Sequence, residues 1–173
     1  MNPVKERRAI DEALSSYRSL LDDFSDDRFA ETPPIGGWSY AEVYDHILKA
    51  TLGASIALER CSHNNCQPTK DGVTLIGHYT LLMGSFPPFK LKSPPETGNV
   101  KKIDKEEAKN LIIKVRKRVD GIAGQIKEAK PQSKYKHPRM GMLTALQWLK
   151  FMRIHLEHHL KQLQRIGKNF NKS

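Results

Sequence analysis

The chain lacks a long apolar run and a signal-like N-terminus. No stretch of its 173 residues approaches the roughly 18 consecutive apolar residues that a membrane-spanning helix needs. The residues from Met1 to Arg8 are mostly polar and charged, so they do not resemble the apolar core of a secretory signal. These two absences predict a soluble protein that has no membrane partner, and the cytoplasm is its expected compartment.

Cysteine is also scarce, because Cys61 and Cys66 are the only two. A reducing compartment favours two free thiols, and a disulfide between them is the alternative. A metal pair of ordinary spacing would need two further ligands, and only His63 is close by. The chain has no Walker, dinucleotide-binding, nucleophile-elbow or zinc-finger motif. These four classes of site are therefore not indicated.

The net charge of +10 is unevenly distributed along the chain. Residues 1–60 hold 7 Lys and Arg against 11 Asp and Glu, whereas residues 61–173 hold 22 against 8. Such asymmetry is found in proteins with a nucleic-acid surface. Here the basic residues are spread out, and 114–118 is the only dense run. We therefore expect no nucleic-acid partner, since an anionic substrate or plain solvation explains the charge as well.

Four segments carry the three- and four-residue spacing of apolar residues that is typical of amphipathic helices. These segments are 3–24, 39 to about 61–65, 104–126 and 144–166, the last ending at Gly167. The first begins behind Asn2, a good helix cap. The other three begin with the residue pairs of a capping box, which are Ser39 and Glu42, Asp104 and Glu107, and Thr144 and Gln147.

Two stretches between these segments are irregular by sequence. In the long connection 66–103, residues 73–83 could form a short helix, and the proline pairs that follow break regular structure. Residues 131–141 join the third and fourth helices. The chain shows no repeat and no domain boundary. Residues 1–173 are therefore expected to form a single all-α domain, a four-helix bundle.

Three of the seven histidines lie on the apolar faces of the expected helices. His46 comes three residues after Val43 within the stripe of the second helix, and His155 and His159 lie one turn apart on the stripe of the fourth. Metal sites in helical bundles are built from inward side chains on facing helices. His158 lies about 100° around the helix from His159 and is expected to face a flank.

Two interpretations of these inward imidazoles stay open. Each could be a core histidine bonded to a neighbour, and an imidazole left unsatisfied there would cost about 1–3 kcal/mol. Alternatively, the i,i+4 pair converges on one ion, as in H-E-x-x-H, and the third imidazole completes one side of the coordination. A shared divalent cation on His46, His155 and His159 is the more economical hypothesis. Imidazole ligands suit zinc, nickel, iron or copper, and we expect one of the first three.

Two motifs resemble those of a known family. Residues 38–47 read W-S-Y-A-E-V-Y-D-H-I, which resembles the W-S-x-x-E-V-x-x-H signature of the DinB-like (DinB/YfiT) superfamily. Residues 155–162, H-L-E-H-H-L-K-Q, resemble the H-x-x-x-H-x-x-Q signature of its last helix. Residues 137–162 are closer still to one uncharacterised branch with H-P-x-x-G before that helix. Met140 departs from this branch, which commonly has an aromatic residue there.

The resemblance covers nearly the whole chain. It implies an up-down-down-up bundle with a long connection between helices two and three, and a homodimer. It also implies a divalent metal on His46, His155 and His159, the same residues that the helical phase selects. Characterised members are thiol transferases that use bacillithiol, mycothiol or glutathione, and a maleylpyruvate isomerase. Others are described as metal-dependent hydrolases.

Two functions follow as hypotheses. In the first, the chain is an enzyme whose metal activates a small thiol or water against a small substrate. Gln162 would then hydrogen-bond to one of the metal-binding histidines and orient its ring. His137 would be an acid–base or substrate-contacting residue, and the alternative for it is an exposed imidazole in a turn. Lysines of the 90–102 loop would attract anionic substrates. In the second, the chain is a non-catalytic metal-binding or stress-response module.

Overall fold

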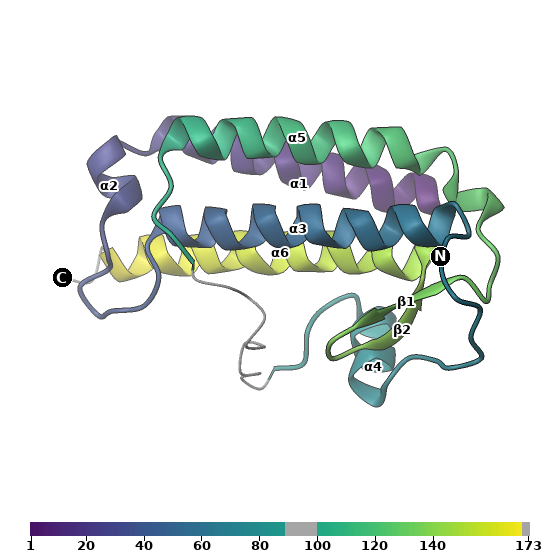
Figure 1. The fold of residues 1–173 in the computed structure, drawn as a ribbon. Helices are drawn as coiled ribbons and strands as arrows, with labels where there is room; N and C mark the ends of the chain where they lie inside the picture. The colour runs from purple at the N-terminus through teal and green to yellow at the C-terminus, as the bar shows by residue number, and fades with distance from the viewer. Residues whose placement is uncertain (89–99, 171–173) are drawn as a thin grey trace.

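Four long helices form the body of the molecule. The computed structural model describes residues 1–88 and 100–170. The long helices are α1 (Pro3–Asp23), α3 (Tyr40–Ser62), α5 (Lys105–Ala123) and α6 (Ala145–Phe170). In Figure 1, α1 and α6 run in one direction and α3 and α5 in the other, which is the predicted up-down-down-up order. Because α3 and α5 are parallel, the chain must return along the bundle between them, and the long connection provides that return.

The helices begin where the predicted caps are. The Asn2 side chain accepts a hydrogen bond from the Val4 amide at 3.0 Å. Ser39 and Glu42 form a complete capping box at the start of α3. The Asp104 carboxylate accepts from the Glu107 amide, and the Thr144 amide donates to the Gln147 side chain at 2.9 Å. These starts are fixed locally, because each cap satisfies backbone amides that the first turn leaves unpaired.

The end of the last helix was predicted wrongly. The helix α6 passes through Gly167 and ends at Phe170. The Phe170 ring stacks on Tyr40 with centroids 6.0 Å apart, and the Arg28 guanidinium lies 4.1 Å from its centre. A Cβ on Gly167 would stand only 3.1 Å from the Tyr40 hydroxyl oxygen. The glycine therefore permits close packing, and contacts with α3 and α2 (Asp26–Ala30) extend the helix beyond it.

Buried tyrosines tie α1 and α3 to α6. The Tyr44 hydroxyl donates to the Tyr17 carbonyl at 2.8 Å, and the Tyr17 hydroxyl donates to the Leu156 carbonyl at 2.8 Å. Both rings are fully buried, and Phe29 of α2 packs edge-on against Tyr44. Burying a hydroxyl without a partner is costly, so these bonds fix how the three helices pack. Leu156 lies within the α6 segment that carries the paired histidines.

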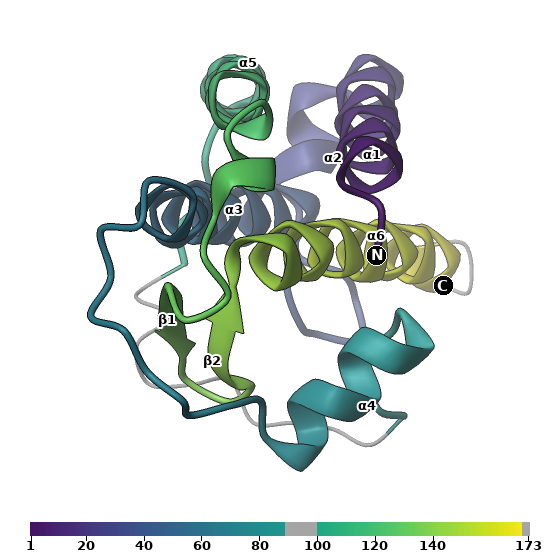
Figure 2. The same ribbon diagram turned by 90° about the vertical axis from the view of Figure 1, so that its right-hand side faces the viewer.

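A small layer covers one side of α3 and α6 (Figures 1 and 2). It consists of α4 (Leu75–Met83) and the antiparallel strands β1 (Lys134–His137) and β2 (Gly141–Thr144), which follow a short 3-10 turn η2 (Ile126–Glu128). The short helix was predicted, but the hairpin lies where an irregular segment was expected. Its strands are only four residues long and depend on a distant segment, since the Met142 amide donates to the Gly72 carbonyl at 3.0 Å.

Gly141 of β2 packs closely against the backbone of residues 72–74 in this layer. It has a positive φ of 82°, and an added Cβ would meet the Gly72 oxygen at 2.6 Å. Gly141→Ala is therefore expected to lower the free energy of unfolding by about 2–3 kcal/mol. Gly121→Ala in α5 is the matched control, because a Cβ added there would have no neighbour within 4 Å. It should stabilise by about 0.5–1 kcal/mol. Denaturant titrations that rank the two variants the other way would contradict this account.

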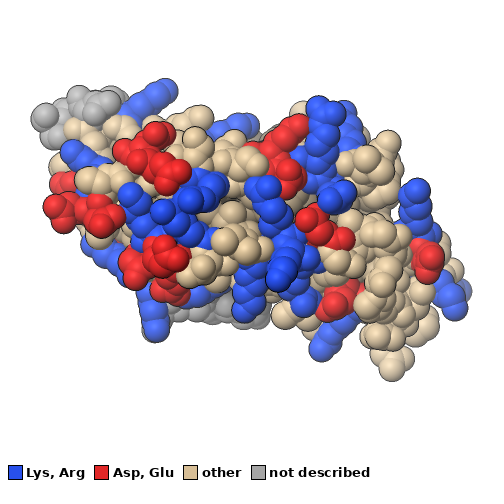
Figure 3. All heavy atoms as spheres, turned by 90° about the horizontal axis from the view of Figure 1, so that it is seen from above, with Lys and Arg blue, Asp and Glu red and all other residues tan. Residues whose placement is uncertain are grey.

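Figure 3 looks down on α1 and α5, where Lys and Arg are interspersed with Asp and Glu. Several of these charges are paired between the two helices. Arg7 bonds Asp120 at 2.7 Å, and Arg116 bonds Asp11 at 3.0 Å. The +10 net charge therefore does not gather into a single basic patch on this face. Within the described parts of the chain, no helix is both long and apolar enough to cross a membrane.

Candidate metal centre

Three imidazoles from two helices converge between α3 and α6. One ring nitrogen each from His46, His155 and His159 lies within 4.8 Å of the other two. The Nε2 atoms of His155 and His159 are 3.1 Å apart. Two nitrogens bound to one tetrahedral ion at the usual 2.0–2.1 Å stand about 3.3 Å apart. The spacing of this pair therefore suits two ligands of the same ion.

Gln162 fixes the orientation of the His159 ring. The Nδ1 atom of His159 lies 2.7 Å from Oε1 of Gln162, an oxygen that only accepts hydrogen bonds. His159 therefore carries its proton on Nδ1, and its Nε2 lone pair faces the other two rings. A carbonyl behind a histidine ligand plays this role in many metal sites. Gln162 contacts one of the three clustered imidazoles, and its role behind a metal ligand stays a prediction.

The surroundings keep these imidazoles neutral. Burial lowers the pKa of His46, of His155 and of His159, the last to about 3. For His155 and His159, the neighbouring imidazoles lower the pKa further. No carboxylate among the described residues joins the cluster. Three uncharged nitrogen donors with available lone pairs fit a divalent ion of intermediate softness, such as zinc, nickel or iron.

Aromatic rings enclose the cluster. Trp38 lies 5.1 Å from the His46 ring, between centroids, and Phe151 stacks on His155 at 5.3 Å. Phe86, from the segment after α4, contacts His155 at 5.8 Å and His158 at 5.1 Å. Phe86 was not predicted as a site residue. The only local signal was the F-P-P-F break, which says nothing about where the ring points.

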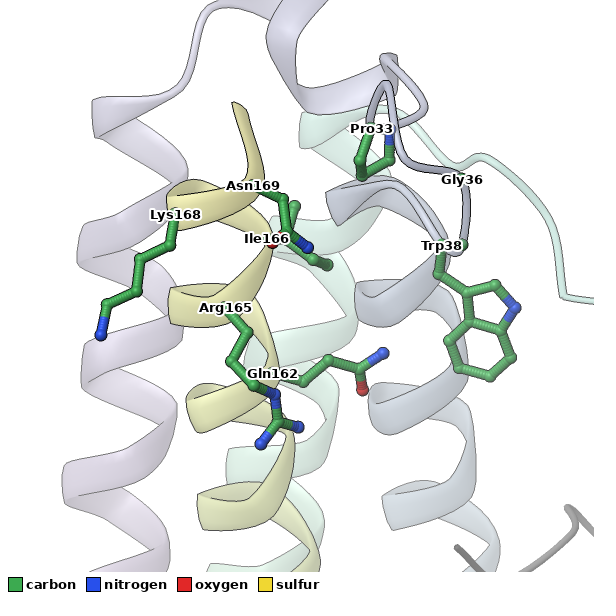
Figure 4. A pocket seen from close by; sticks show the side chains of 9 residues that line it. Pro33, Gly36, Trp38, Gln162, Arg165, Ile166, Lys168 and Asn169 are labelled. Atoms are coloured by element: carbon green, nitrogen blue, oxygen red, sulfur yellow. The ribbon is translucent and has the colours of Figure 1, made fainter. Parts of the chain in front are cut away.

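A cavity of about 410 Å³ opens beside the cluster. Figure 4 shows Gln162, which bonds His159, and Trp38, which contacts His46, among its lining residues. Arg165 and Lys168 of α6 also line it, so it is electropositive. The sequence predicted positive charge on the 90–102 loop as well. Lys90 and Lys92 of that loop lie outside the described residues.

The remaining part of that loop is tied to the bundle. The Lys101 amide donates to the buried Asp45 carboxylate at 3.0 Å, and the Lys102 ammonium donates to Thr32 at 2.9 Å. Asp45 also pairs with Lys49 one turn along α3. The backbone of Lys101 is therefore held next to the start of the His46 turn of α3. Among the described residues, the positive charges that line the cavity beside the cluster are Arg165 and Lys168 of α6.

The comparisons identify the family. A sequence model of the DinB superfamily matches residues 9–163. The chain belongs to this superfamily. Its fold is shared by TT2238, which is described as a four-helix bundle protein. The crystal structure of TT2238 is 21% identical in sequence and has a TM-score of 0.57, and the match covers 94% of this chain and 96% of the TT2238 chain. The structure of YfiT from Bacillus subtilis is 12% identical in sequence and has a TM-score of 0.60. The match covers 98% of this chain and 87% of the YfiT chain.

YfiT is described as a probable metal-dependent hydrolase with an unusual four-helix bundle topology. At 12% identity, the likeness shows the fold of this DinB-superfamily chain and does not transfer an activity. No curated protein matches the chain. The narrower branch suggested by the residues around Met140 stays a prediction.

His137 ends β1 and has a role in the hairpin turn. Its Nδ1 atom accepts hydrogen bonds from the amides of Arg139, at 3.2 Å, and Met140, at 3.1 Å. Its ring packs 4.5 Å from Phe151 and 5.4 Å from Trp148, so it is not the exposed turn imidazole that was the alternative. The neutral ring must carry its proton on Nε2. It can donate a hydrogen bond there, but this tautomer has no free lone pair for a general base.

This arrangement makes folding sensitive to acid. Burial, with a smaller effect of Arg139, lowers the pKa of His137 to about 4. In the unfolded chain, His137 takes up its proton with a pKa of about 6.5. Its contribution to the free energy of unfolding is therefore fully present above that pH and is lost as the pH falls through about 4. The expected loss from this group is on the order of 3 kcal/mol. His137→Asn retains an acceptor for the turn without titrating, so it should reduce the loss.

Denaturant titrations of both proteins at about pH 7 and about pH 4.5 measure this difference. The other buried histidines titrate in both proteins, so the difference between the two losses reports the effect of replacing His137. An asparagine variant with the same acid-induced loss as the natural chain would contradict the assignment.

Proposed function

We propose that this DinB-superfamily chain is a metal-dependent enzyme that activates a small thiol or water against a small electrophilic substrate. The convergence of three neutral imidazoles, with no carboxylate among the described residues of the cluster, carries the proposal. Three protein ligands are typical of catalytic sites, which keep a position for an exchangeable ligand, whereas structural sites use four. The description of YfiT as a probable metal-dependent hydrolase supports the same class of function.

The residues around the cluster have distinct tasks in this proposal. A divalent ion bound by His46, His155 and His159 supplies Lewis acidity, which lowers the pKa of a water or thiol ligand. Gln162 holds His159 in the binding tautomer. Trp38 and Phe86 provide apolar walls that limit the access of bulk water.

The electropositive cavity determines which substrates suit the site. Arg165 and Lys168 favour a small substrate or thiol that carries a carboxylate. For His137 we propose only hydrogen-bond donation from Nε2 to the substrate. Its Nδ1 already accepts hydrogen bonds from two amides of the hairpin turn, so it cannot serve as a base. Phe151 contacts both His137 and His155, so such a donation would occur at the edge of the site.

The test uses untagged, metal-loaded protein with a panel of low-molecular-weight thiols and the electrophile monochlorobimane. Conjugation that requires a thiol and is lost in His46→Ala supports thiol transfer, and turnover of an activated ester without thiol supports hydrolysis. No turnover in either assay, together with an unchanged visible spectrum of the cobalt-substituted protein when thiols are added, would overturn the proposal. The chain would then be the non-catalytic module.

We also propose that the chain is a single domain that pairs as a homodimer. The helix α4 has no charged residue and exposes three apolar side chains, Leu75, Leu82 and Met83. Light scattering is expected to give twice the 19.7 kDa of one chain, and Leu82→Glu should shift the mass towards the monomer. Ile113→Glu, at an exposed apolar position of α5, is the control. A monomer mass for the natural chain at all concentrations would contradict pairing.

A further inference from the structure

We propose that Cys61 and Cys66 form a second reactive site, a dithiol pair that exchanges with small anionic disulfides. This site does not depend on the metal. Cys61 lies 15 residues after His46 on α3, which corresponds to about 22 Å along the helix. The two Sγ atoms are 3.8 Å apart, and both cysteines are free thiols.

The end of α3 brings the two sulfurs together. The Asn65 amide donates to the Arg60 carbonyl at 2.9 Å, and the Asn64 amide donates to the Cys61 carbonyl at 3.2 Å. Asn64 has a φ of 58°, the left-handed conformation that reverses the chain at many helix ends. This reversal folds Cys66 back against the last turn of the helix. The pair therefore depends on the helix-terminating turn, and its sulfurs would close from 3.8 Å to the roughly 2 Å of a disulfide.

The two thiols differ in access. Cys61 is fully buried, and its Sγ also lies 3.6 Å from the Leu143 carbonyl of β2. Cys66 is only partly buried and lines a cavity of about 570 Å³ beside the hairpin. Figure 2 shows the chain leaving α3 on this side of the molecule. A molecule in the cavity therefore reaches Cys66 first.

The cavity selects for negative charge. Arg60, Lys134 and Lys136 line it, and no Asp or Glu appears in its described lining. Arg60 lies over the Tyr135 ring, and the Lys134 ammonium donates to the Asp71 carbonyl, so neither charge is neutralised by these contacts. Cationic groups around a cavity attract anionic reactants. Disulfides that carry carboxylates are the matching class of substrate.

The exchange needs no group beyond the disulfide itself. The Cys66 thiolate attacks one sulfur of the disulfide, and the first thiolate leaves and takes up a proton. Cys61 Sγ then attacks Cys66 Sγ, the second thiolate leaves, and the Cys61 proton passes to it. Two electrons pass from the protein dithiol to the disulfide, which becomes two thiols. Burial raises the pKa of Cys61 to about 12, with Cys66 as the next cause, so Cys61 stays protonated during the first step.

The first experiment follows the reduced full-length chain in glutathione disulfide by acid quenching, alkylation and intact-mass measurement. The natural chain is expected to form a transient mixed disulfide with glutathione. It should then form the internal disulfide, which lowers its intact mass by the mass of two hydrogen atoms. Cys61→Ser should stop at a stable adduct on Cys66, and Cys66→Ser should react slower by on the order of tenfold or more, because Cys61 is buried. Equal rates for Cys66→Ser and the natural chain, or a permanent adduct on the natural chain, would overturn the proposal. Circular dichroism checks folding, and Cys61→Ala replaces Cys61→Ser if the serine variant does not fold.

The second experiment tests the substrate class with anionic dithiodipropionate and cationic cystamine. Each rate is divided by the rate of the same disulfide with free N-acetylcysteine amide, which corrects for its intrinsic reactivity. The corrected rate should favour the anion by on the order of tenfold at low salt. Lys136→Glu should reduce this preference because Lys136 lines the cavity. Lys117→Glu makes the same charge change at an exposed position of α5 and should leave the preference unchanged. Equal corrected rates would refute the anionic preference.

Discussion

Replacing both His155 and His159 with alanine is expected to reduce the metal content from about one ion per chain to almost none. Only His46 of the cluster would remain, and one imidazole does not hold a divalent ion against dilution or a chelator. Elemental analysis of protein purified without a polyhistidine tag measures the content directly. A double variant that keeps its full metal content would remove the basis of the proposed centre.

Two single substitutions sharpen this test. His158→Ala removes an adjacent histidine whose ring faces Phe86, and it should leave the metal content unchanged. Gln162→Leu removes the oxygen that holds His159 at 2.7 Å, and it should weaken metal affinity by about 10–100-fold. An equal loss in both variants would indicate a general disturbance of α6 instead.

The second large effect is expected in the buried ion pair between α1 and α6. Arg153 bonds Glu6 and Glu157, each at 2.6 Å, and the Glu6 side chain is only 10% exposed. Arg153→Leu would leave the Glu6 carboxylate buried without its partner. The free energy of unfolding is therefore expected to fall by about 3–5 kcal/mol. Urea denaturation with a two-state fit measures this loss.

Two further variants separate burial from charge. Arg8→Ala breaks an exposed pair with Glu12, whose side chains are 81% and 63% exposed, and should cost less than about 0.5 kcal/mol. Replacing Glu6 and Arg153 together with leucine and methionine should recover much of the loss, because no charge is then left unpaired. If Arg153→Leu costs no more than Arg8→Ala, the buried pair contributes little to stability.

Local signals predicted the parts of the fold that depend on local chemistry. Capping residues at Ser39, Asp104 and Thr144 set the helix starts, because a cap involves side chains within three residues of one another. Local signals failed for the end of the last helix, which was predicted at Gly167. Contacts of Phe170 with other helices extend that helix to Phe170. Helical phase placed His46, His155 and His159 on inward faces, but only the packing of α3 against α6 shows that they meet.

The features that sequence reasoning missed arise from contacts between distant segments. The hairpin is held by Gly72, which lies far before it in the chain, so its four-residue strands carry too little local pattern to be predicted. Phe86 and Arg165 reach the site from a loop and from a helix surface. His137 was singled out for possible chemistry, but its neighbours in the turn give its Nδ1 atom a structural task.

The ligand geometry has a consequence for how the chain is held together. His46 and His155 lie on adjacent antiparallel helices but are separated by about two thirds of the sequence, including the whole return connection and α5. An ion bound by both would act as a cross-link that closes one very long loop. The entropy removed by such a closure grows only with the logarithm of loop length, so the two helices could be clamped with little penalty for the size of the intervening segment. The length of that connection would then be free to vary among chains that keep the same clamp.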